Sequence, residues 1–419
     1  MAALYGLAKR NWQIRKPPEA PSKAPEPLKF GILGAADIGP DALITPAKTH
    51  PEVVVQAVAA RDRTKAQAYA QKHGIAEVKA TYQDILDDPK IDCVYVPLPA
   101  GLHFEWALRA LKAGKHVLLE KPSVNNAEEA KALFRHKLLS APGAPVLLEA
   151  AHHLFHPAFA KFMSYVTPRE VERAEAVLWV PRWKFAADNI RYRYELGGGA
   201  LMDLGTYTAS ALVHVFGAVA EECEECVTEP GSYDSRCDRL FRARYRFRSG
   251  GYGEMRGDLK APLDHLSPDI HVVHKPVVIS AVEAGVDVPD GHEVWRTRKV
   301  KFANFVQPAF LHSITVDDSF ELRRVGDASG VVKTWRSTRT VKAYSFREAE
   351  VDQPGEPYWA TYRYQLEQFV NKVRGKNVTQ LVSGEDSINT TRMIDMAYAK
   401  SGLPLRKTRI LTFAPPMDS

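Results

Sequence analysis

The sequence predicts an α/β fold followed by an α+β fold: an N-terminal doubly wound parallel (Rossmann) sheet, then a domain with a large, mostly antiparallel open sheet. Three observations lead to this prediction. The chain has 419 residues, which is too long for one ordinary hydrophobic core. Between residues 28 and 150, short apolar strands alternate with helical segments, as in a parallel sheet covered on both faces. After residue 150, strand-like segments follow one another without regular helices between them.

The dinucleotide-binding Rossmann domain is expected to span residues 28–150. Glycines end several of its expected elements: Gly34 ends the first strand, and Gly74 and Gly114 end helices. Thr64 is the expected N-cap of the helix that ends at Gly74. Connections between parallel strands are nearly always right-handed, which favours a doubly wound topology. The expected strands are 28–34, 53–60, 93–97, 116–120 and 146–149, and the expected helices include 103–113 and 127–138.

Two segments flank this domain. Residues 1–27 are expected to form an extended leader, because 13–27 are Pro-rich and polar; the apolar residues before them could dock on the body as a short helix. Residues 151–419 are expected to form an α+β domain for substrate binding and dimerisation. Within it, aromatic residues alternate with arginines along 241–248, so one face of that strand is aromatic and the other basic. The expected strands are 175–180, 240–247, 271–279 and 294–302, and the expected closing helices are 362–373 and 385–399.

Composition and charge exclude several classes of function. The 56 Lys and Arg against 50 Asp and Glu give a net charge of +6, without the basic block that is typical of nucleic-acid-binding proteins. No apolar run approaches the ~20 residues of a membrane span, and the first residues do not resemble a signal peptide. We therefore expect a cytoplasmic protein with a small-molecule substrate and a phosphorylated cofactor, forming a homodimer through the C-terminal sheet.

The four cysteines do not predict a metal site. Cys93 lies in an apolar strand, where a buried inert thiol is expected. Cys223 and Cys226 have the spacing of metal ligands, but Cys237 is the only nearby third ligand, and a structural zinc site needs four. Free reduced thiols are the expected state.

The segment from Gly34 to Gly39 follows the first strand, where a dinucleotide-binding fingerprint belongs. Ala36 replaces the glycine at which the backbone approaches the pyrophosphate, and alanine is the least costly replacement. In this strand–turn–helix context we expect Gly34, Ala36, Asp37, Ile38 and Gly39 to bind phosphate at the helix N-terminus. The alternative is a plain tight turn.

The end of the second strand indicates which cofactor binds. NAD enzymes carry an acidic residue there, which binds the ribose hydroxyls. Arg61 instead follows two alanines, which leaves room for a 2′-phosphate and offers it a planar set of donors, so NADP is predicted. Asp62 would favour NAD, but it comes one residue late and starts to face the helix. A solvated surface arginine is the third interpretation.

The tripeptide Glu120-Lys121-Pro122 comes at the carboxyl end of a predicted parallel strand. Ligands of open α/β sheets bind at that edge, so Lys121 is expected beside the nicotinamide. Pro122 restricts the backbone of Lys121 and so fixes the direction of its side chain. A surface Glu–Lys pair is the alternative, which the buried strand before it makes less favourable.

These motifs together resemble the Gfo/Idh/MocA family of NAD(P)-dependent oxidoreductases, and within it the branch of NADP-dependent D-xylose dehydrogenases and dimeric dihydrodiol dehydrogenases. The resemblance runs in order from residue 28 to about 215, with weaker agreement in the last two helices. It implies that Lys121, Tyr207 and Asp203 are catalytic. The motifs that carry it are Glu120-Lys121-Pro122, Pro97-Leu98-Pro99 with His103, Glu149-Ala150 with His156-Pro157, and the glycine-rich segment 197–207 that ends in Tyr207. The cofactor contacts that it implies in these motifs are Leu98, Pro99, His103, Glu120 and Lys121.

The mechanism that the resemblance implies needs a base, and Tyr207 is the candidate. Ionising a tyrosine of pKa ~10 at pH 7 costs about 4 kcal/mol, and an ammonium roughly 4 Å away returns about 4 kcal/mol at an effective dielectric near 20. Lys121 could therefore make Tyr207 a usable base. Asp203, one helical turn before Tyr207, would hold substrate hydroxyls or orient Lys121. The alternative is that 197–199 is a loop, with Asp203 capping a helix and Tyr207 in the core.

Three departures from the family pattern surround the cofactor: Asp37 stands where Arg is frequent, Ala100 where Asn is common, and His153-Leu154 where an aromatic–Arg pair is frequent. The predicted function is an NADP-dependent oxidoreductase that transfers hydride between nicotinamide and a sugar or vicinal diol. The departures motivate two alternatives: a carbonyl or imine substrate from a specialised metabolite, or a non-catalytic NADP-binding protein.

Overall fold

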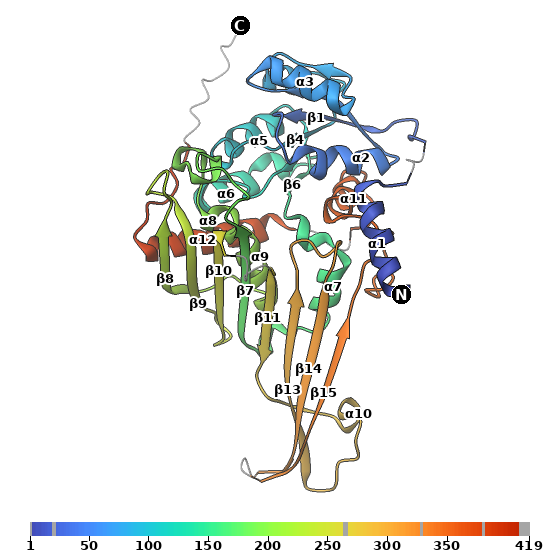
Figure 1. Cartoon of the computed structure of the whole chain (residues 1–419), viewed down its shortest axis with the longest axis vertical. Coiled ribbons are helices and arrows are strands. Elements are labelled where there is room, and N and C mark those ends of the chain that lie inside the picture. Colours follow the sequence, from blue (N-terminus) through green and yellow to red (C-terminus); the bar gives the residue numbers. More distant parts are fainter. Residues whose placement is uncertain (1, 19–21, 263–266, 327–329, 379–381, 410–419) are drawn as a thin grey trace.

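The computed structural model describes residues 2–18, 22–262, 267–326, 330–378 and 382–409. Its N-terminal part is a six-stranded sheet in the order β3-β2-β1-β4-β5-β6, and every pair of neighbouring strands is parallel. This confirms the predicted Rossmann sheet, shown in blue to cyan in Figure 1. The strands are β1 (Leu28–Leu33), β2 (Val53–Ala59), β3 (Glu77–Val78), β4 (Cys93–Val96), β5 (His116–Leu119) and β6 (Leu147–Glu149).

Helices cover the two faces of this sheet, and two details differ from the prediction. The chain after β1 starts with a π-helical turn, η1 (Pro40–Ile44), before the short α2 (Thr45–Thr49). The predicted N-cap Thr64 is wrong, because the Oδ1 of Asp62 accepts hydrogen bonds from the backbone N–H groups of Thr64 and Lys65, at 2.9 and 3.2 Å. The remaining helices are α3 (Arg63–His73), α4 (Tyr82–Leu86), α5 (His103–Lys112) and α6 (Ala127–Phe134).

The second sheet has nine strands in the order β15-β14-β13-β11-β7-β10-β9-β8, with β12 paired to β13. It is mostly antiparallel, as predicted, but β10 runs parallel to β7. The predicted strand 271–279 is two strands, because Lys275-Pro276 interrupts the ladder where proline has no N–H to donate. The strands are β7 (Val171–Pro181), β8 (Glu222–Pro230), β9 (Asp238–Arg246), β10 (Tyr252–Ala261), β11 (Asp269–His274), β12 (Val277–Ile279), β13 (His292–Ala303), β14 (Ser313–Arg324) and β15 (Val331–Val341).

The aromatic face of β9 is buried, as predicted. Phe241 and Tyr245 point into the core, while Arg242 and Arg246 on the other face pair with glutamates of the neighbouring strands. Helices α9 and α12 cover the core face, and α12 also packs on α6 of the Rossmann domain. The helices here are α7 (Pro157–Met163), α8 (Ala200–Asp203), α9 (Gly205–Phe216), α10 (Ala281–Ala284), α11 (Thr361–Val373) and α12 (Gly384–Ser401). The 3-10 turns are η2 (Ala100–Leu102), η3 (Lys137–Leu139), η4 (His152–Phe155), η5 (Pro168–Glu170), η6 (Ile190–Tyr192) and η7 (Tyr194–Leu196).

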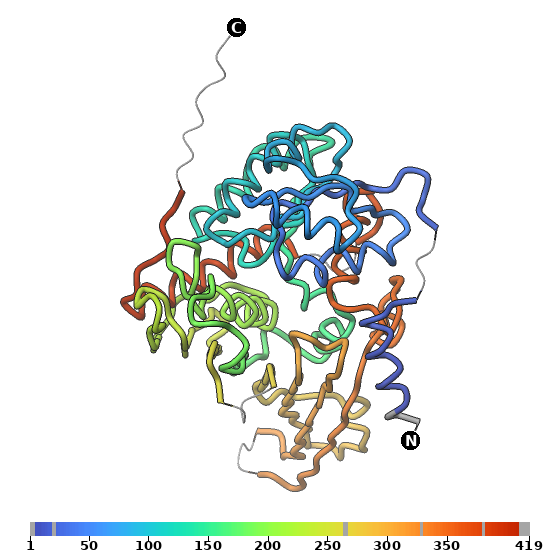
Figure 2. The backbone as a smooth tube through the Cα atoms, turned by 45° about the horizontal axis from the view of Figure 1, so that its top comes forward, coloured from blue at the N-terminus to red at the C-terminus, as the bar shows by residue number. Residues whose placement is uncertain are grey.

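The short helix that the residues before the Pro-rich stretch could form is present as α1 (Ala2–Arg15), which also includes the first residues of that stretch. The helix docks on the second domain rather than on the Rossmann sheet, beside α11 (Figures 1 and 2). Arg10 holds it there: its Nε and Nη2 donate to the carbonyls of Ala309 and Phe310, both at 3.2 Å, and its guanidinium stacks on Tyr344. Composition alone does not reveal these contacts of Arg10 with the second domain.

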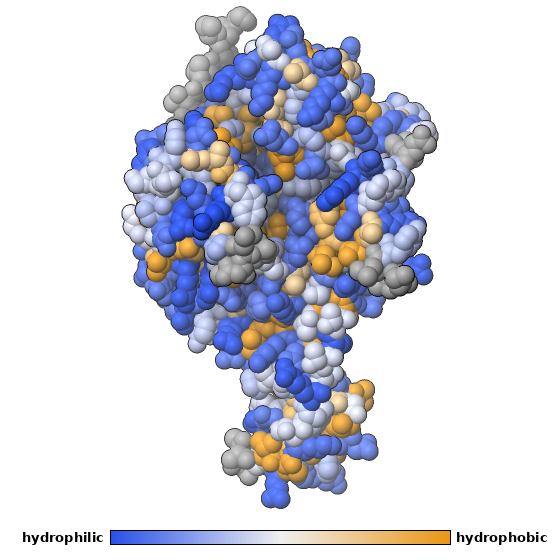
Figure 3. Space-filling model, in the orientation of Figure 1, coloured by the Kyte–Doolittle hydropathy of each residue, from blue (hydrophilic) through white to orange (hydrophobic). Residues whose placement is uncertain are grey.

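The far ends of β13, β14 and β15 extend beyond the body as an arm. Its small separate core contains Ile279, Val294 and Phe320, and apolar side chains are exposed at its end (Figure 3). Within the described ranges, we find no helix whose length and hydropathy would let it cross a membrane.

Candidate active site

Lys121 lies at the carboxyl end of β5, at the meeting point of the two domains. Its Nζ is 2.7 Å from the Oδ1 of Asp203 and 3.2 Å from the Asp203 carbonyl oxygen. Asp203 is the last residue of α8, which follows the glycine-rich segment 197–199. The structure therefore brings together the strand end of one domain and a helix end of the other, as the sequence predicts.

Asp203 holds two cations, because its Oδ2 also accepts a hydrogen bond from the Nε of Arg191 at 2.7 Å. Burial would raise the pKa of Asp203, but the guanidinium of Arg191 and the ammonium of Lys121 lower it well below its usual value. The carboxylate is thus ionised and fully used by protein cations. Of the two roles predicted for Asp203, the geometry fits the orientation of Lys121.

Tyr207, on α9, lies on the other side of Lys121. The ammonium is 4.5 Å from the centroid of the phenol ring, and only 8% of Tyr207 is exposed. The predicted pKa effect is wrong: burial, followed by the charges of Asp203 and Glu120, raises the pKa of Tyr207 well above 10. Asp203 neutralises Lys121, and the ammonium lies over the ring instead of at the phenol oxygen, so Tyr207 remains protonated.

His152 is a site residue that the sequence analysis missed. Its Nε2 is 3.0 Å from the phenol oxygen of Tyr207, and its Nδ1 is 2.9 Å from the Oγ1 of Thr361, the first residue of α11. Burial, and then the charge of Lys121, lower the pKa of His152 to about 3, so the ring is neutral. A neutral imidazole donates from one nitrogen and accepts at the other. One tautomer accepts from the Tyr207 phenol at Nε2 and donates from Nδ1 to Thr361, and the other tautomer reverses both hydrogen bonds.

Arg191 is the second residue that sequence reasoning missed. It lies in η6, and its guanidinium packs 4.1 Å from the ring centroid of Phe185. Nothing in its local sequence distinguishes it from other arginines. The sequence does carry a signal for His152, because two consecutive histidines, His152 and His153, follow the strand that ends at Glu149. Only His153 was considered above. His153 is buried and contacts the Oγ of Ser210 at 3.2 Å.

His103 is held by the main chain through both nitrogens of its ring, and its contact with the cofactor stays a prediction. Its Nδ1 lies 2.8 Å from the carbonyl oxygen of Pro122, and its Nε2 lies 2.6 Å from that of Leu98. Both ring nitrogens are thus occupied by the main chain. Burial lowers the pKa of His103 to about 4. The side chain ties the turn after β4 to the segment after β5, and so positions Leu98 and Lys121.

Glu120 is buried next to Lys121 and is held by the protein. Its Oε1 accepts a hydrogen bond from the hydroxyl of Tyr95 at 2.7 Å, and burial raises its pKa. Leu98 and Pro99 follow the neighbouring strand β4 at the same edge of the sheet, where a flat ring could lie against them.

The glycine motif after β1 has the shape of a close-approach turn. Gly34 has φ +117°, which other residues rarely adopt, and a Cβ there would lie 3.1 Å from the Cδ2 of Leu98. A Cβ at Gly39 would collide with the hydroxyl of Tyr69, which donates to the Ala36 carbonyl at 3.2 Å. This tight cradle fits a dinucleotide whose phosphates approach the backbone.

The charged residues around this cradle favour a phosphorylated ligand. Asp37 is exposed on the turn, so its carboxylate can point away from a bound anion. Arg61 is exposed just after β2, whereas the neighbouring Asp62 caps α3. Among the described residues, no group of three or more His, Cys, Asp or Glu side chains could hold a metal ion.

Comparison with known proteins identifies the N-terminal part of the chain. Residues 28–137 match a family described as an oxidoreductase family with an NAD-binding Rossmann fold, Gfo/Idh/MocA. This N-terminal segment thus matches the Gfo/Idh/MocA family. The resemblance inferred from the motifs is thereby confirmed.

Curated proteins with similar sequences act on sugars or diols, according to their names. A dTDP-3,4-didehydro-2,6-dideoxy-α-D-glucose 3-reductase from Streptomyces antibioticus is 37% identical over 196 residues, 45% of this chain and 57% of that protein. A D-xylose 1-dehydrogenase (NADP⁺) from Haloferax volcanii is 37% identical over 188 residues, 44% and 56% of the two chains. A trans-1,2-dihydrobenzene-1,2-diol dehydrogenase from Xenopus tropicalis is 32% identical over 212 residues, 48% and 60%. The matched segments thus span little more than half of each relative.

Solved structures of similar fold cover more of the chain. A 3-ketoreductase from Actinomadura kijaniata in complex with NADP and TDP-benzene has a TM-score of 0.64 at 22% identity, covering 90% of this chain and 98% of that one. A levoglucosan dehydrogenase in complex with NADH and levoglucosan has a TM-score of 0.66 at 18% identity, with the same coverage. At these identities the likeness establishes the fold of both domains.

Proposed function

We propose that this protein is an NADP-dependent oxidoreductase that transfers hydride between nicotinamide and a sugar or vicinal diol. The observation that carries the proposal is the contact of Lys121 with both Asp203 and Tyr207 at the carboxyl edge of the Rossmann sheet. The named sugar and diol substrates of the curated relatives support the substrate class. The cofactor, when bound, supplies or accepts the hydride.

In this proposal the turn from Gly34 to Gly39 holds the pyrophosphate, with the backbone of Ala36, Asp37 and Ile38 closest to it. Leu98, Pro99 and Glu120 border the nicotinamide. Arg61 binds the 2′-phosphate, because its guanidinium is exposed at the end of β2 and Asp62 is engaged in capping α3. His103 supports this surface from behind through its bonds to Leu98 and Pro122.

Replacing Arg61 by alanine is expected to weaken NADPH binding and leave NADH binding unchanged. A charge-assisted hydrogen bond contributes roughly 1.5–3 kcal/mol, so the Kd for NADPH should rise roughly tenfold to a hundredfold. Fluorescence titration of both nucleotides measures this. Arg63→Ala, two residues away on the exposed start of α3, is the matched control. An equal loss for both nucleotides in Arg61→Ala would refute the 2′-phosphate assignment.

Reduction of a keto sugar, or of a related carbonyl or imine, is a second candidate function. It is favoured by the protonation of the Tyr207 phenol, which can give its proton to a substrate oxygen but cannot take one at neutral pH. Neutral His152 holds the hydroxyl until substrate arrives. A dTDP-sugar 3-reductase among the relatives supports the same reading.

The raised pKa of Tyr207 gives the two directions of reaction different pH dependence. The phenol is protonated below its pKa, so the kcat of reduction should stay level up to about pH 10, the value of a free tyrosine. Oxidation needs the ionised phenol, so its kcat should rise about tenfold per pH unit from pH 6 to 9. Initial rates in both directions provide the measurement. A reduction rate that falls with an apparent pKa near 7 would contradict the assignment.

A substrate panel tests the function itself. NADPH consumption with keto sugars, and NADP⁺ reduction with aldoses and vicinal diols, should show turnover in at least one class. Tight NADPH binding without turnover of any class would support the non-catalytic alternative instead, and absence of NADPH binding would refute all three readings.

The proposal includes a homodimer through the open face of the nine-stranded sheet. That face has a hollow of about 600 Å³ lined by side chains of both signs, among them Arg173, Glu175, Arg256 and Lys301. Mixed charges of this kind can complement a second copy related by twofold symmetry. The molecular mass in solution tests this.

The free thiols of all four cysteines support the predicted cytoplasmic location.

A further inference from the structure

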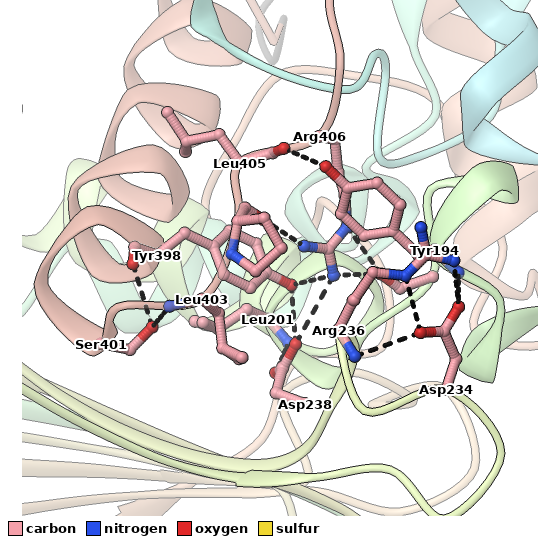
Figure 4. A network of polar contacts seen from close by, with 12 residues as sticks. Tyr194, Leu201, Asp234, Arg236, Asp238, Tyr398, Ser401, Leu403, Leu405 and Arg406 are labelled. Atoms are coloured by element: carbon pink, nitrogen blue, oxygen red, sulfur yellow. Dashed lines mark hydrogen bonds and ion pairs between the residues drawn. The ribbon is translucent and has the colours of Figure 1, made fainter.

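Residues 403–409, which we call the C-terminal strap, leave α12 and run back across the junction of the two domains. Figure 4 shows Arg406 of this strap at the centre of a buried polar network. The hydroxyl of Tyr194, in η7, donates to the carbonyl of Leu405 and fixes the strap from the other side. The network contacts the glycine-rich segment 197–199 and the first turn of α8.

The side chain of Arg406 holds the segment that leads to Asp203. Its Nε donates to the carbonyl oxygen of Gly198 at 2.9 Å, and its Nη2 contacts the same oxygen. Nη2 also donates to the hydroxyl of Tyr398 at 2.8 Å. Arg406 is only 3% exposed, so these bonds form in a dry environment where they are strong.

Asp238 completes the network and fixes the first turn of α8. This fully buried carboxyl lies 3.7 Å from Arg406, and it accepts from the N–H of Leu201 at 2.6 Å and from the Tyr398 hydroxyl at 2.7 Å. Burial raises the pKa of Asp238, so its charge depends on the nearby guanidinium. Gly199 has φ +127°, and a Cβ there would collide with Arg406, Asp238 and Tyr398. The loop is therefore fitted to this network.

The main chain of the same strap holds the segment that follows Lys121. The carbonyl of Arg406 accepts from the Nδ2 of Asn126 at 2.9 Å, and the carbonyl of Lys407 accepts from the Nδ2 of Asn125 at 3.2 Å. Asn126 is the N-cap of α6 and lies five residues after Lys121. Arg406 thus binds the Asp203 side with its guanidinium and the Lys121 side with its carbonyl.

We propose that Arg406 is a positioning residue that keeps Lys121 and Asp203 in contact by bonding the two segments that carry them. It touches neither substrate nor cofactor and acts through Gly198, Leu201 and Asn126. The consequence for turnover rests on the proposed function. A misplacement of about 1 Å at a reacting group can cost about 10²-fold in rate. Loss of Arg406 should therefore lower kcat by misplacing Lys121 and Asp203.

Three variants test this inference: Arg406→Gln, Arg406→Lys and the control Arg409→Gln. Arg409 belongs to the same strap, but its side chain is more exposed and pairs with Glu105 at 3.5 Å. We expect Arg406→Gln to lower kcat roughly tenfold to a hundredfold, with KM and the Kd for NADPH within about threefold. Arg406→Lys keeps the charge beside Asp238 and should recover part of kcat. The control should behave as wild type.

Hydrogen–deuterium exchange supplies a readout that does not need a substrate. Arg406→Gln should raise exchange in both 121–129 and 197–207, while the buried strand β4 stays protected. Wild-type kcat in Arg406→Gln, or faster exchange confined to the strap, would overturn the inference.

Should Arg406→Gln fail to fold, the variant Tyr398→Phe replaces it, because it removes one hydrogen bond of the network. It is expected to give a smaller rise of exchange in the same two segments, and no change there would overturn the inference as well. If the wild-type protein turns over no substrate, the proposed function fails, and the exchange comparison still decides the positioning role.

Discussion

Lys121→Met should lower kcat roughly 10²–10⁴-fold, the range usually lost with a positioned proton-transfer or charge-stabilising group. The substitution removes the ammonium that lies 2.7 Å from Asp203 and over the ring of Tyr207. Asp203 keeps Arg191 as a partner, so the loss of stability should be modest, about 1–3 kcal/mol. NADPH titration and steady-state kinetics on any substrate that the panel identifies separate binding from chemistry. A variant with normal NADPH binding and normal kcat would refute the catalytic role of Lys121.

Lys115→Met is the matched control for this experiment. Lys115 is also buried and precedes the same strand, β5, but at the amino end of the sheet. Its Nζ donates to the carbonyls of Asp88 and Ile91, both at 2.7 Å. Its loss should therefore reduce thermal stability and leave kcat unchanged. Equal losses of kcat in the two variants would mean that Lys121 acts through stability.

Tyr207→Phe should lower kcat by a similar factor, roughly 10²–10⁴-fold, because the phenol is the only proton donor or acceptor that the described contacts place beside Lys121 and next to His152. The ring remains, so packing against the ammonium is retained. The variant should also lose the pH dependence of oxidation that the wild type shows. The measurement is kcat in both directions across pH 6–10.

Tyr245→Phe provides the corresponding control, since Tyr245 is fully buried and its hydroxyl donates to the Met393 carbonyl at 2.8 Å, within the core. We expect it to cost roughly 0.5–1.5 kcal/mol of stability without affecting turnover. Should Tyr207→Phe retain wild-type rates, the proton must pass through another group, and His152 would then be the first residue to replace.

The sequence predicted the central pair of the site because its position follows from local rules. A strand end in a parallel sheet lies at the ligand edge, and Glu120-Lys121-Pro122 follows a buried strand. The partners His152 and Arg191 come from short 3-10 turns whose place depends on tertiary packing. The pKa of Tyr207 was predicted in the wrong direction because spacing along the chain does not reveal which part of the ring faces the ammonium.

The distinction between features set by the local sequence and features set by tertiary packing also holds for the fold. Five of the six Rossmann strands, all but β3, and also β9 were predicted, since apolar runs and alternation mark them. β3, β8, β10, β14 and β15 were missed, and polar or charged residues dominate β8, β14 and β15. β15 is an edge strand with nearly every residue exposed, so it has no buried face to leave a periodic signal. Its pairing with β14 combines backbone hydrogen bonds with cross-strand contacts such as the stacking of Trp335 on Phe320, which the local sequence does not reveal.

The passage of α12 onto the Rossmann domain has a consequence for how the protein is made. Ile388 of α12 belongs to the same core cluster as Leu108, Leu119 and Leu133, and Asp395 accepts a hydrogen bond from the N–H of Ala127 at 2.7 Å. The core of the first fold is therefore incomplete until nearly the whole chain has left the ribosome. During synthesis, the Rossmann sheet therefore exposes apolar surface until α12 has been made. Chaperone binding should matter most during this interval, because exposed apolar surface promotes aggregation.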